Sequence, residues 1–279
     1  MLVTKLGNYS RGTGTDMWRR PEFVLLGDSL TQFSFGSGGW GARLADTYSR
    51  YADVTLRGFS GYTSRWIQHV LPALFPAARV GAAPALVTVF LGANDAALPA
   101  PLFKQPPDAS RQHVPLHEYA DNMRAIVDAI RASGAHRVLL ITPPPLVEEK
   151  WKQHCVQTYG VPVDAQSNRN FETTAAYAAT CVRVAGEVGA PVVDLQRAFL
   201  GVDGWERLLP DGLHLSAEGQ AVVYDAVSSA IVREWPELRP TYFGDTATDK
   251  MPIDFPDHKE IDPADPAAAF REALKRAQA

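Results

Sequence analysis

Short apolar runs alternate with longer amphipathic stretches along most of the chain. The runs are rich in Val and Leu and lack polar alternation, as expected for strands that are buried on both faces of a parallel sheet. They cover Phe23–Leu26, Val54–Leu56, Leu86–Leu91, Val138–Ile141 and Pro191–Leu195. Because helical patterns lie between them, the sequence predicts a doubly wound α/β fold with a parallel five-stranded sheet.

The stretches between the runs carry their apolar residues on one helical face. In one of the clearest, Tyr119, Met123 and Ile126 recur at helical spacing. Glycine or proline, which end helices, follows directly after the three longest stretches. The predicted helices are Glu118–Ser133, Thr173–Val188 and Ala217–Trp235, with a shorter one around Ala42–Tyr48.

Three segments do not follow this alternation. Leu98–Pro115 is rich in proline and predicts a surface loop, and Pro143–Asn170 shows little periodicity after a strand, where a lid over a site would lie. Pro236–Pro263 is rich in proline and aspartate and precedes a short helix predicted at Ala267–Ala277. We therefore divide the chain into an N-terminal arm (1–20), a domain (21–235) and a C-terminal tail (236–279).

The composition is that of an ordinary globular protein, and the net charge argues against nucleic acid as a partner. The 279 residues are 46% hydrophobic and carry a net charge of −4, so nothing indicates binding to nucleic acid. Cys155 and Cys181 are the only cysteines, too few for a disulfide framework. No apolar run matches a secretory signal or a membrane span. We expect a cytoplasmic protein, and a homo-oligomer stays open.

Ser29 directly follows the first predicted strand, in the sequence Gly27-Asp28-Ser29-Leu30. Open α/β sheets bind ligands at the carboxyl ends of their strands, where this hydroxyl could act as a nucleophile. Far downstream, Asp211 and His214 share a turn that leads into a predicted helix, with Ser216 as its cap. His214 could act as a base towards Ser29, with Asp211 bound to its other ring nitrogen.

Each of these residues has a simpler interpretation when taken alone. A serine after a strand often serves as a turn residue or a helix cap, and His214 is one of seven histidines. A metal site at Asp211 and His214 is a weaker interpretation, because no third ligand lies at a recognisable spacing. The combination of serine, acid and histidine favours a serine hydrolase.

Serine attack on an ester makes the carbonyl oxygen negative, so hydrogen-bond donors must face it. Gly61 follows the second predicted strand and could offer its backbone N–H; Asn94 follows the third and could offer its side-chain amide. The backbone N–H of Ser29 would be a third donor. Asp28 is adjacent to Ser29 and cannot also hold the far side of the histidine, so we assign it to accepting backbone N–H bonds in the turn.

Four blocks of the sequence resemble those of the SGNH, or GDSL, hydrolases, and most closely those of the isoamyl acetate-hydrolysing esterase group. The blocks contain Ser29, Gly61, Asn94 and His214, and the first reads Gly-Asp-Ser-Leu. The resemblance extends over residues 21–235. The supporting stretches are Gly27–Gln32, Arg57–Tyr62, Gly92–Asp95, Gln112–Tyr119, Thr142–Pro145 and Asp211–Gly219.

This resemblance implies a flavodoxin-like, three-layer α/β/α fold and hydrolysis of carboxylic esters through an acyl-enzyme, with small acyl groups such as acetate favoured. It implies Ser29 as nucleophile, His214 as base and Asp211 as the partner of the base. Ser29, Gly61 and Asn94 would form the oxyanion hole. No metal or organic cofactor is implied, and the partner would be a small-molecule ester.

The residues leave several alternatives open. An acyltransferase or a carbohydrate deacetylase on the same fold would use the same groups, because only the acceptor or the ester differs. A non-catalytic binding protein is a remote alternative, since the nucleophile and the base are both present. Trp151 and Tyr159, in the predicted lid segment, are candidates for an apolar substrate-binding wall, or else anchors of that segment on the surface.

Overall fold

The computed structural model describes residues 20–76, 83–99, 111–241, 251 and 253–271. They belong to two compact units, of which the larger covers residues 21–253. The smaller contains Arg20 and residues 254–271 of the described chain. The division into an arm, a domain and a tail stays a prediction.

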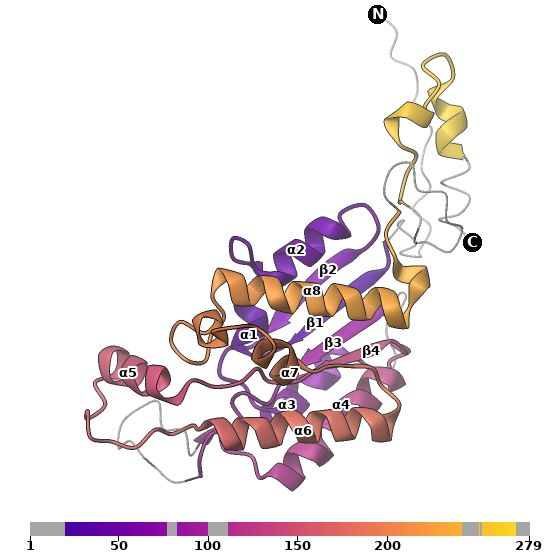
Figure 1. Cartoon of the computed structure of the whole chain (residues 1–279). Helices are drawn as coiled ribbons and strands as arrows, with labels where there is room; N and C mark the ends of the chain where they lie inside the picture. Colours follow the sequence, from indigo (N-terminus) through magenta and orange to yellow (C-terminus); the bar gives the residue numbers. More distant parts are fainter. Residues whose placement is uncertain (1–19, 77–82, 100–110, 242–250, 252, 272–279) are drawn as a thin grey trace, which may run out of the picture. The chain divides into compact units, whose positions relative to one another are not determined.

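The larger unit is built on a five-stranded, all-parallel sheet with the strand order β2-β1-β3-β4-β5 (Figure 1). The predicted α/β fold is therefore confirmed. The strands are β1 (Glu22–Gly27), β2 (Asp53–Gly58), β3 (Leu86–Phe90), β4 (Val138–Ile141) and β5 (Val192–Val193). The fifth is shorter than the predicted Pro191–Leu195, because Asp194 caps helix α7, which begins at Leu195.

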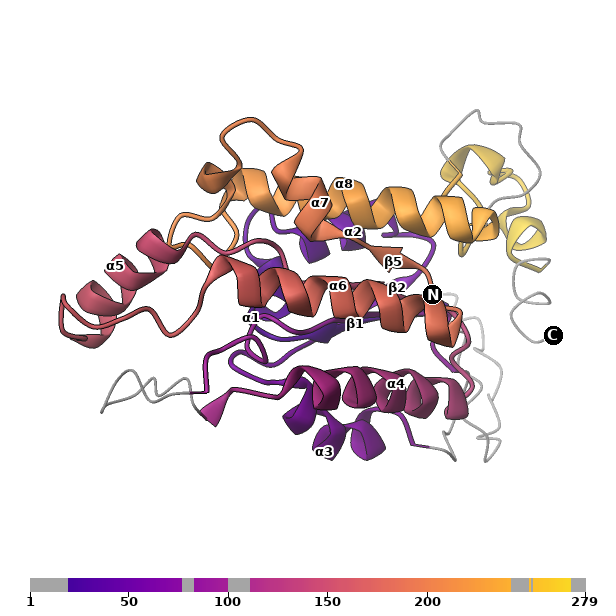
Figure 2. The same ribbon diagram turned by 60° about the horizontal axis from the view of Figure 1, so that its bottom comes forward.

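Helices cover both faces of the sheet, because each face is apolar. Along β1, Phe23 and Leu25 enter one core, whereas Val24 and Leu26 enter the other. The first core is covered by α2 (Trp40–Thr47), α5 (Glu148–Tyr159), α7 (Leu195–Leu200) and α8 (Ala217–Glu234). The second is covered by α3 (Ser64–Leu74), α4 (Leu116–Ala132) and α6 (Phe171–Val188). Figure 2 shows α3 and α4 on the opposite side of the sheet from α8.

The long helices begin and end within a few residues of the predicted positions. The sequence did not predict helices α3 and α5, nor the shorter α1 (Ser29–Gln32) and α7. Helix α3 begins after Thr63, whose side chain accepts a hydrogen bond from the Trp66 N–H, and it continues through Pro72. Helix α5 lies inside Pro143–Asn170, where a segment with little periodicity was expected, because only Trp151 and Cys155 of this helix are buried.

The short elements complete the part of the chain that the structure describes. They are α1 (Ser29–Gln32) and the 3-10 helices η1 (Phe33–Phe35), η3 (Trp205–Leu208), η4 (Pro236–Leu238) and η5 (His258–Glu260). Residues 266–271 are helical, which agrees with the start of the predicted last helix; the rest of it, like most of the predicted loop Leu98–Pro115, lies outside the described residues. No helix within the described ranges has the length and apolar character needed to cross a membrane.

Candidate active site

Ser29 is the first residue of helix α1, directly after the carboxyl end of β1. As predicted, Asp28 accepts a backbone bond in this turn: its Oδ1 lies 2.9 Å from the N–H of Leu30. Only glycine fits at position 27, directly before Asp28, since a Cβ there would lie 2.1 Å from Oγ1 of Thr31 and 2.6 Å from the carbonyl oxygen of Phe90. The tight turn therefore presents the Ser29 hydroxyl at the edge of the sheet.

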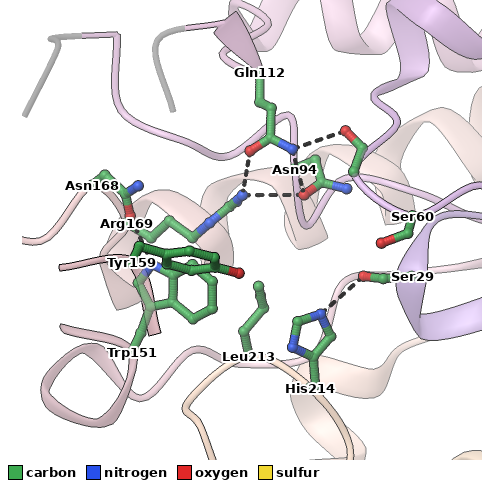
Figure 3. A pocket seen from close by; sticks show the side chains of 11 residues that line it. Ser29, Ser60, Asn94, Gln112, Trp151, Tyr159, Asn168, Arg169, Leu213 and His214 are labelled. Carbon is green, nitrogen blue, oxygen red and sulfur yellow. Dashed lines mark hydrogen bonds between the residues drawn. The ribbon is translucent and has the colours of Figure 1, made fainter. Parts of the chain in front are cut away.

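His214 connects Ser29 to Asp211 through its two ring nitrogens. Nε2 lies 3.1 Å from Oγ of Ser29, and Nδ1 lies 2.7 Å from Oδ2 of Asp211. The other carboxylate oxygen, Oδ1, accepts the backbone N–H groups of Leu213 and His214 at 2.9 and 2.7 Å. Figure 3 shows the His214 ring directed at Ser29. The structure thus brings together three residues that the sequence paired only by type and order.

The protonation state of Asp211 decides the direction of the hydrogen bonds that join Asp211, His214 and Ser29. Burial by itself would raise the pKa of Asp211, but the hydrogen bonds and the proximity of His214 outweigh it and hold the pKa at about 2. An ionised carboxylate only accepts hydrogen bonds, so the hydrogen of this bond lies on Nδ1 of His214. In a neutral imidazole the other ring nitrogen, Nε2, is then a hydrogen-bond acceptor. The arrangement suits proton transfer from the Ser29 hydroxyl to His214.

Gly61 and Asn94 lie after the carboxyl ends of β2 and β3, as predicted from the order of the runs. The φ angle of Gly61 is +80°, a conformation that favours glycine. The side-chain amide of Asn94 donates from Nδ2 to the carbonyl oxygen of Tyr62 at 2.9 Å. An amide nitrogen carries two hydrogens, so this bond leaves the second one for another acceptor.

Ser29, Gly61, Asn94 and His214 line one pocket with a volume of about 110 Å³. Trp151 and Tyr159 line it as well, on α5. Trp151 is buried and donates from its indole N–H to Oδ1 of Asn168 at 2.7 Å, whereas Tyr159 is 39% exposed. The remaining lining residues are Ser60, Gln112, Asn168, Arg169 and Leu213.

Arg169 and Gln112 carry no role in the sequence-based prediction, although both line the pocket. Arg169 is only 3% exposed, which is unusual for an arginine. It belongs to the polar sequence Ser167-Asn168-Arg169-Asn170, which is typical of the residues that precede a helix. Asn170 does cap α6. Sequence patterning therefore offered no signal that this cation would be buried.

Buried charges lie beside the pocket. Burial raises the pKa of Asp28 to about 7 and that of Asp95 to about 6, while it lowers the pKa of Arg169 to about 10. The Asp95 carboxylate accepts the backbone N–H of Ser64 at 2.9 Å. Oδ2 of Asp28 has no hydrogen-bond partner among the described residues.

Residues 25–222 match the GDSL-like lipase/acylhydrolase family. A GDSL esterase/lipase of Arabidopsis thaliana is 42% identical over 255 residues, which are 91% of this chain and 98% of that protein. An isoamyl acetate-hydrolyzing esterase 1 homolog of Homo sapiens is 38% identical over 235 residues, 82% of this chain and 90% of that protein.

Solved structures show the same fold at lower sequence identity. A lipase/acylhydrolase from Enterococcus faecalis has a TM-score of 0.58 at 21% identity and covers 80% of this chain and 100% of its own. A catalytic mutant of an acetylxylan esterase from Geobacillus stearothermophilus has a TM-score of 0.57 at 21% identity, with coverages of 77% and 96%. These structures support the three-layer arrangement.

Proposed function

Because the chain belongs to the GDSL-like lipase/acylhydrolase family and is a carboxylic ester hydrolase, we propose that it is a serine esterase that cleaves short-chain, acetyl-type esters through an acyl-enzyme. The observation that carries this proposal is the continuous hydrogen-bonded chain from Ser29 through His214 to Asp211 in a pocket. Such a chain is the arrangement that activates a serine hydroxyl.

In this mechanism Ser29 Oγ attacks the ester carbonyl carbon while Nε2 of His214 takes the hydroxyl proton. The tetrahedral intermediate collapses, and the protonated His214 gives the proton to the departing alkoxide, which leaves as the alcohol. A water molecule then attacks the acyl-enzyme, with His214 again as base, and releases the carboxylic acid and free Ser29. Asp211 holds the imidazole in place and stabilises its charged form throughout.

The oxyanion would be held by the backbone N–H groups of Ser29 and Gly61 and by the amide of Asn94. Ser29 is the first residue of α1, so its N–H has no acceptor within the helix. The N-terminal position also favours a negative charge, although α1 is a short helix. Three donors from the ends of three neighbouring strands could thus converge on one oxygen.

The pocket supports a preference for small acyl groups. The pocket has a volume of about 110 Å³. Trp151 and Tyr159 line one side of it (Figure 3), and we propose them as the substrate-binding wall. The alcohol portion would leave on the side of His214, where the ring of Phe33 stands edge-on to His214 at 5.8 Å and is 50% exposed. An apolar alcohol would suit that surface, in keeping with the isoamyl acetate named for the human relative.

The test is hydrolysis of a series of esters from acetate to octanoate, with isoamyl acetate included, by wild type, Ser29→Ala and Ser229→Ala. Ser229 is exposed on α8 and provides the matched control. We expect Ser29→Ala to abolish turnover, Ser229→Ala to retain it, and wild-type kcat/KM to be highest for acetate. Equal turnover by wild type and Ser29→Ala would refute the serine mechanism.

The same series, run with added alcohol, distinguishes hydrolysis from acyl transfer. If an alcohol captured the acyl group in preference to water, the protein would be an acyltransferase, and activity only on acetylated sugars would make it a carbohydrate deacetylase. We expect the free acid as the main product. The predicted cytoplasmic location is part of the proposal, and size-exclusion chromatography would decide whether a homo-oligomer forms.

A further inference from the structure

A buried arginine lies behind the two oxyanion donors that are not part of the serine turn. Arg169 donates from one terminal nitrogen to Oδ1 of Asn94 at 3.1 Å and to Oε1 of Gln112 at 2.9 Å. Its other terminal nitrogen donates to the carbonyl oxygen of Ala93. Figure 3 shows Gln112, Asn94 and the Arg169 guanidinium in contact along the wall opposite Ser29 and His214.

Gln112 extends this contact to the second donor. Its Nε2 donates to the carbonyl oxygen of Gly61 at 2.9 Å and to Oδ1 of Asn94 at 3.2 Å. Gln112 therefore touches the residues that supply both donors, while its own oxygen faces Arg169. Arg169 and Gln112 can therefore influence the two donor residues without contacting the Ser29 hydroxyl.

The chemistry of the guanidinium determines how both amides are oriented. An amide side chain has a donor end and an acceptor end of almost the same shape, so it can in principle be turned over. A guanidinium has only donors, so it can hydrogen-bond only to the oxygen ends of Asn94 and Gln112. Nδ2 of Asn94 then points away from Arg169, and Nε2 of Gln112 points to Gly61 and Asn94.

We propose that Arg169 and Gln112 are positioning residues: they orient the Asn94 amide and anchor Gly61 through its carbonyl oxygen, so that the Asn94 and Gly61 N–H donors are directed at the developing oxyanion. This inference rests on the proposed function, because it assigns a task only if Asn94 and Gly61 are oxyanion donors. It goes beyond that function by naming two residues that act through the donors and not on the substrate.

The surroundings keep Arg169 in place and charged. Its guanidinium lies over the Trp151 ring, 5.6 Å from the centroid, where a cation is attracted by the aromatic face. Burial lowers the pKa of Arg169 to about 10, and the nearby carboxyls of Asp28 and Asp95 act in the opposite direction. The side chain therefore remains a cation at neutral pH, when its donors are required.

The test uses Gln112→Glu, which keeps the shape of the side chain and can still pair with Arg169. Glutamate cannot donate to the Gly61 carbonyl or to Oδ1 of Asn94, so both contacts become repulsive. We expect kcat and kcat/KM for a short acetate ester to fall together, about 10- to 100-fold, since misplaced catalytic groups cost rates of this order. Gln157→Glu, at an exposed position on α5, makes the same change in charge and should retain wild-type kinetics.

A double-mutant cycle with Asn94→Ala decides whether Gln112 acts through Asn94. If it does, Gln112→Glu should cost much less in the Asn94→Ala background than in wild type. Equal costs in both backgrounds, a change in KM alone, or an unchanged kcat in Gln112→Glu would overturn the inference. If Asn94→Ala itself keeps wild-type kcat, the oxyanion assignment in the proposed function fails; if only Gln112→Glu does so, the proposed function stands.

Arg169 is tested by comparing Arg169→Lys with Arg169→Met. Lysine keeps the charge and donors, so it should recover part of the kcat that methionine loses, provided that thermal melting shows both variants folded. If Arg169→Lys and Arg169→Met are both folded and have the same kcat, the charge of Arg169 does not help to position the donors. If Arg169→Met does not fold, the Gln112 cycle alone decides the proposal.

Discussion

At the scale of single residues, the site depends on side chains that have only one kind of hydrogen-bonding group. Asp211, as a carboxylate, only accepts, and it thereby determines which nitrogen of His214 carries the proton. Arg169 only donates, and it binds the oxygen ends of the Asn94 and Gln112 amides, which leaves their nitrogen ends directed elsewhere. The ambiguous groups, an imidazole and two amides, are each oriented by an unambiguous neighbour.

Replacing Asn94 by alanine should remove one oxyanion donor. We expect kcat for acetate esters to fall by about 10² to 10³, as for other hydrolases that lose one such donor. The melting temperature should fall while the protein stays folded, because Asn94 is buried and its loss leaves the Tyr62 carbonyl and an Arg169 donor without their partner. Steady-state kinetics and thermal melting together check this prediction, and a near-wild-type kcat would contradict it.

Replacing Asp211 by alanine should be more severe. Without the carboxylate, the His214 ring loses its orientation and its preferred tautomer, and losses of about 10⁴ in kcat are known for this change in serine hydrolases. Asp128→Ala, at an exposed position on α4, is the matched control. Normal turnover by Asp211→Ala would show that another acid supports His214.

At the scale of secondary-structure elements, the site is assembled from tight turns that each need glycine. Gly212 links Asp211 to Leu213 and His214 with a φ of +89°. A Cβ at Gly212 would lie 2.3 Å from the carbonyl oxygen of Val147 and 2.6 Å from the backbone nitrogen of Trp151. The acid–histidine turn is thus packed directly against the start of α5.

Gly212→Ala should therefore disturb both stability and catalysis, whereas Gly160→Ala should affect stability alone. Both glycines have positive φ, so each substitution costs about 1–2 kcal/mol for the backbone conformation. Gly160, which ends α5, has open space around it, whereas crowding at Gly212 adds about 1–3 kcal/mol. Urea unfolding and kcat check this: we expect lower kcat only for Gly212→Ala, and equal effects of both would be contrary evidence.

At the scale of the whole molecule, the layered fold encloses charged groups beside the site. Asp28 and Asp95 are fully buried, and Arg169 is almost so. Burial is the largest cause of the raised pKa of Asp28, and the charge of Asp95 adds to it; the Leu30 N–H, His214 and Arg169 act in the opposite direction. Folding therefore makes ionisation of Asp28 unfavourable.

Asp28 should make the stability of the protein depend on pH. Its pKa is about 7 in the folded state and about 3.9 in an unfolded chain. As the pH rises between these values, the unfolded chain loses a proton that the folded protein keeps, so the free energy of unfolding decreases. Its contribution is fully present below the unfolded value and is lost above the folded one.

Asp28→Asn lacks this titration, so its stability deficit relative to wild type should shrink from about pH 4 to about pH 8. The amide is itself buried without a new partner for its N–H groups, and a deficit at low pH is expected. Urea unfolding of both proteins across this range is the measurement. A deficit that stays constant or grows with pH would show that Asp28 does not titrate in this way.

The sequence alone was sufficient for the features that depend on local chemistry. Apolar runs without alternation marked the strands, and Gly134, Gly189 and Pro236 marked the ends of long helices within a few residues. The turn sequences placed Ser29, Gly61 and Asn94 after strand ends, because parallel strands share one carboxyl edge. Helix α5, with its weak apolar stripe, was missed, and β5 was predicted too long, since tertiary packing and not local pattern determines them.

Only the tertiary structure decided how the polar atoms meet. Ser29 and His214 are 185 residues apart in the chain, and no pattern specifies the 3.1 Å between their side chains. Likewise, the sequence gives no reason to bury Arg169, because the cost of burying a cation is offset by acceptors that Ala93, Asn94 and Gln112 bring from distant segments. Local propensities determine elements, whereas buried hydrogen bonds depend on groups that only the folded chain brings together.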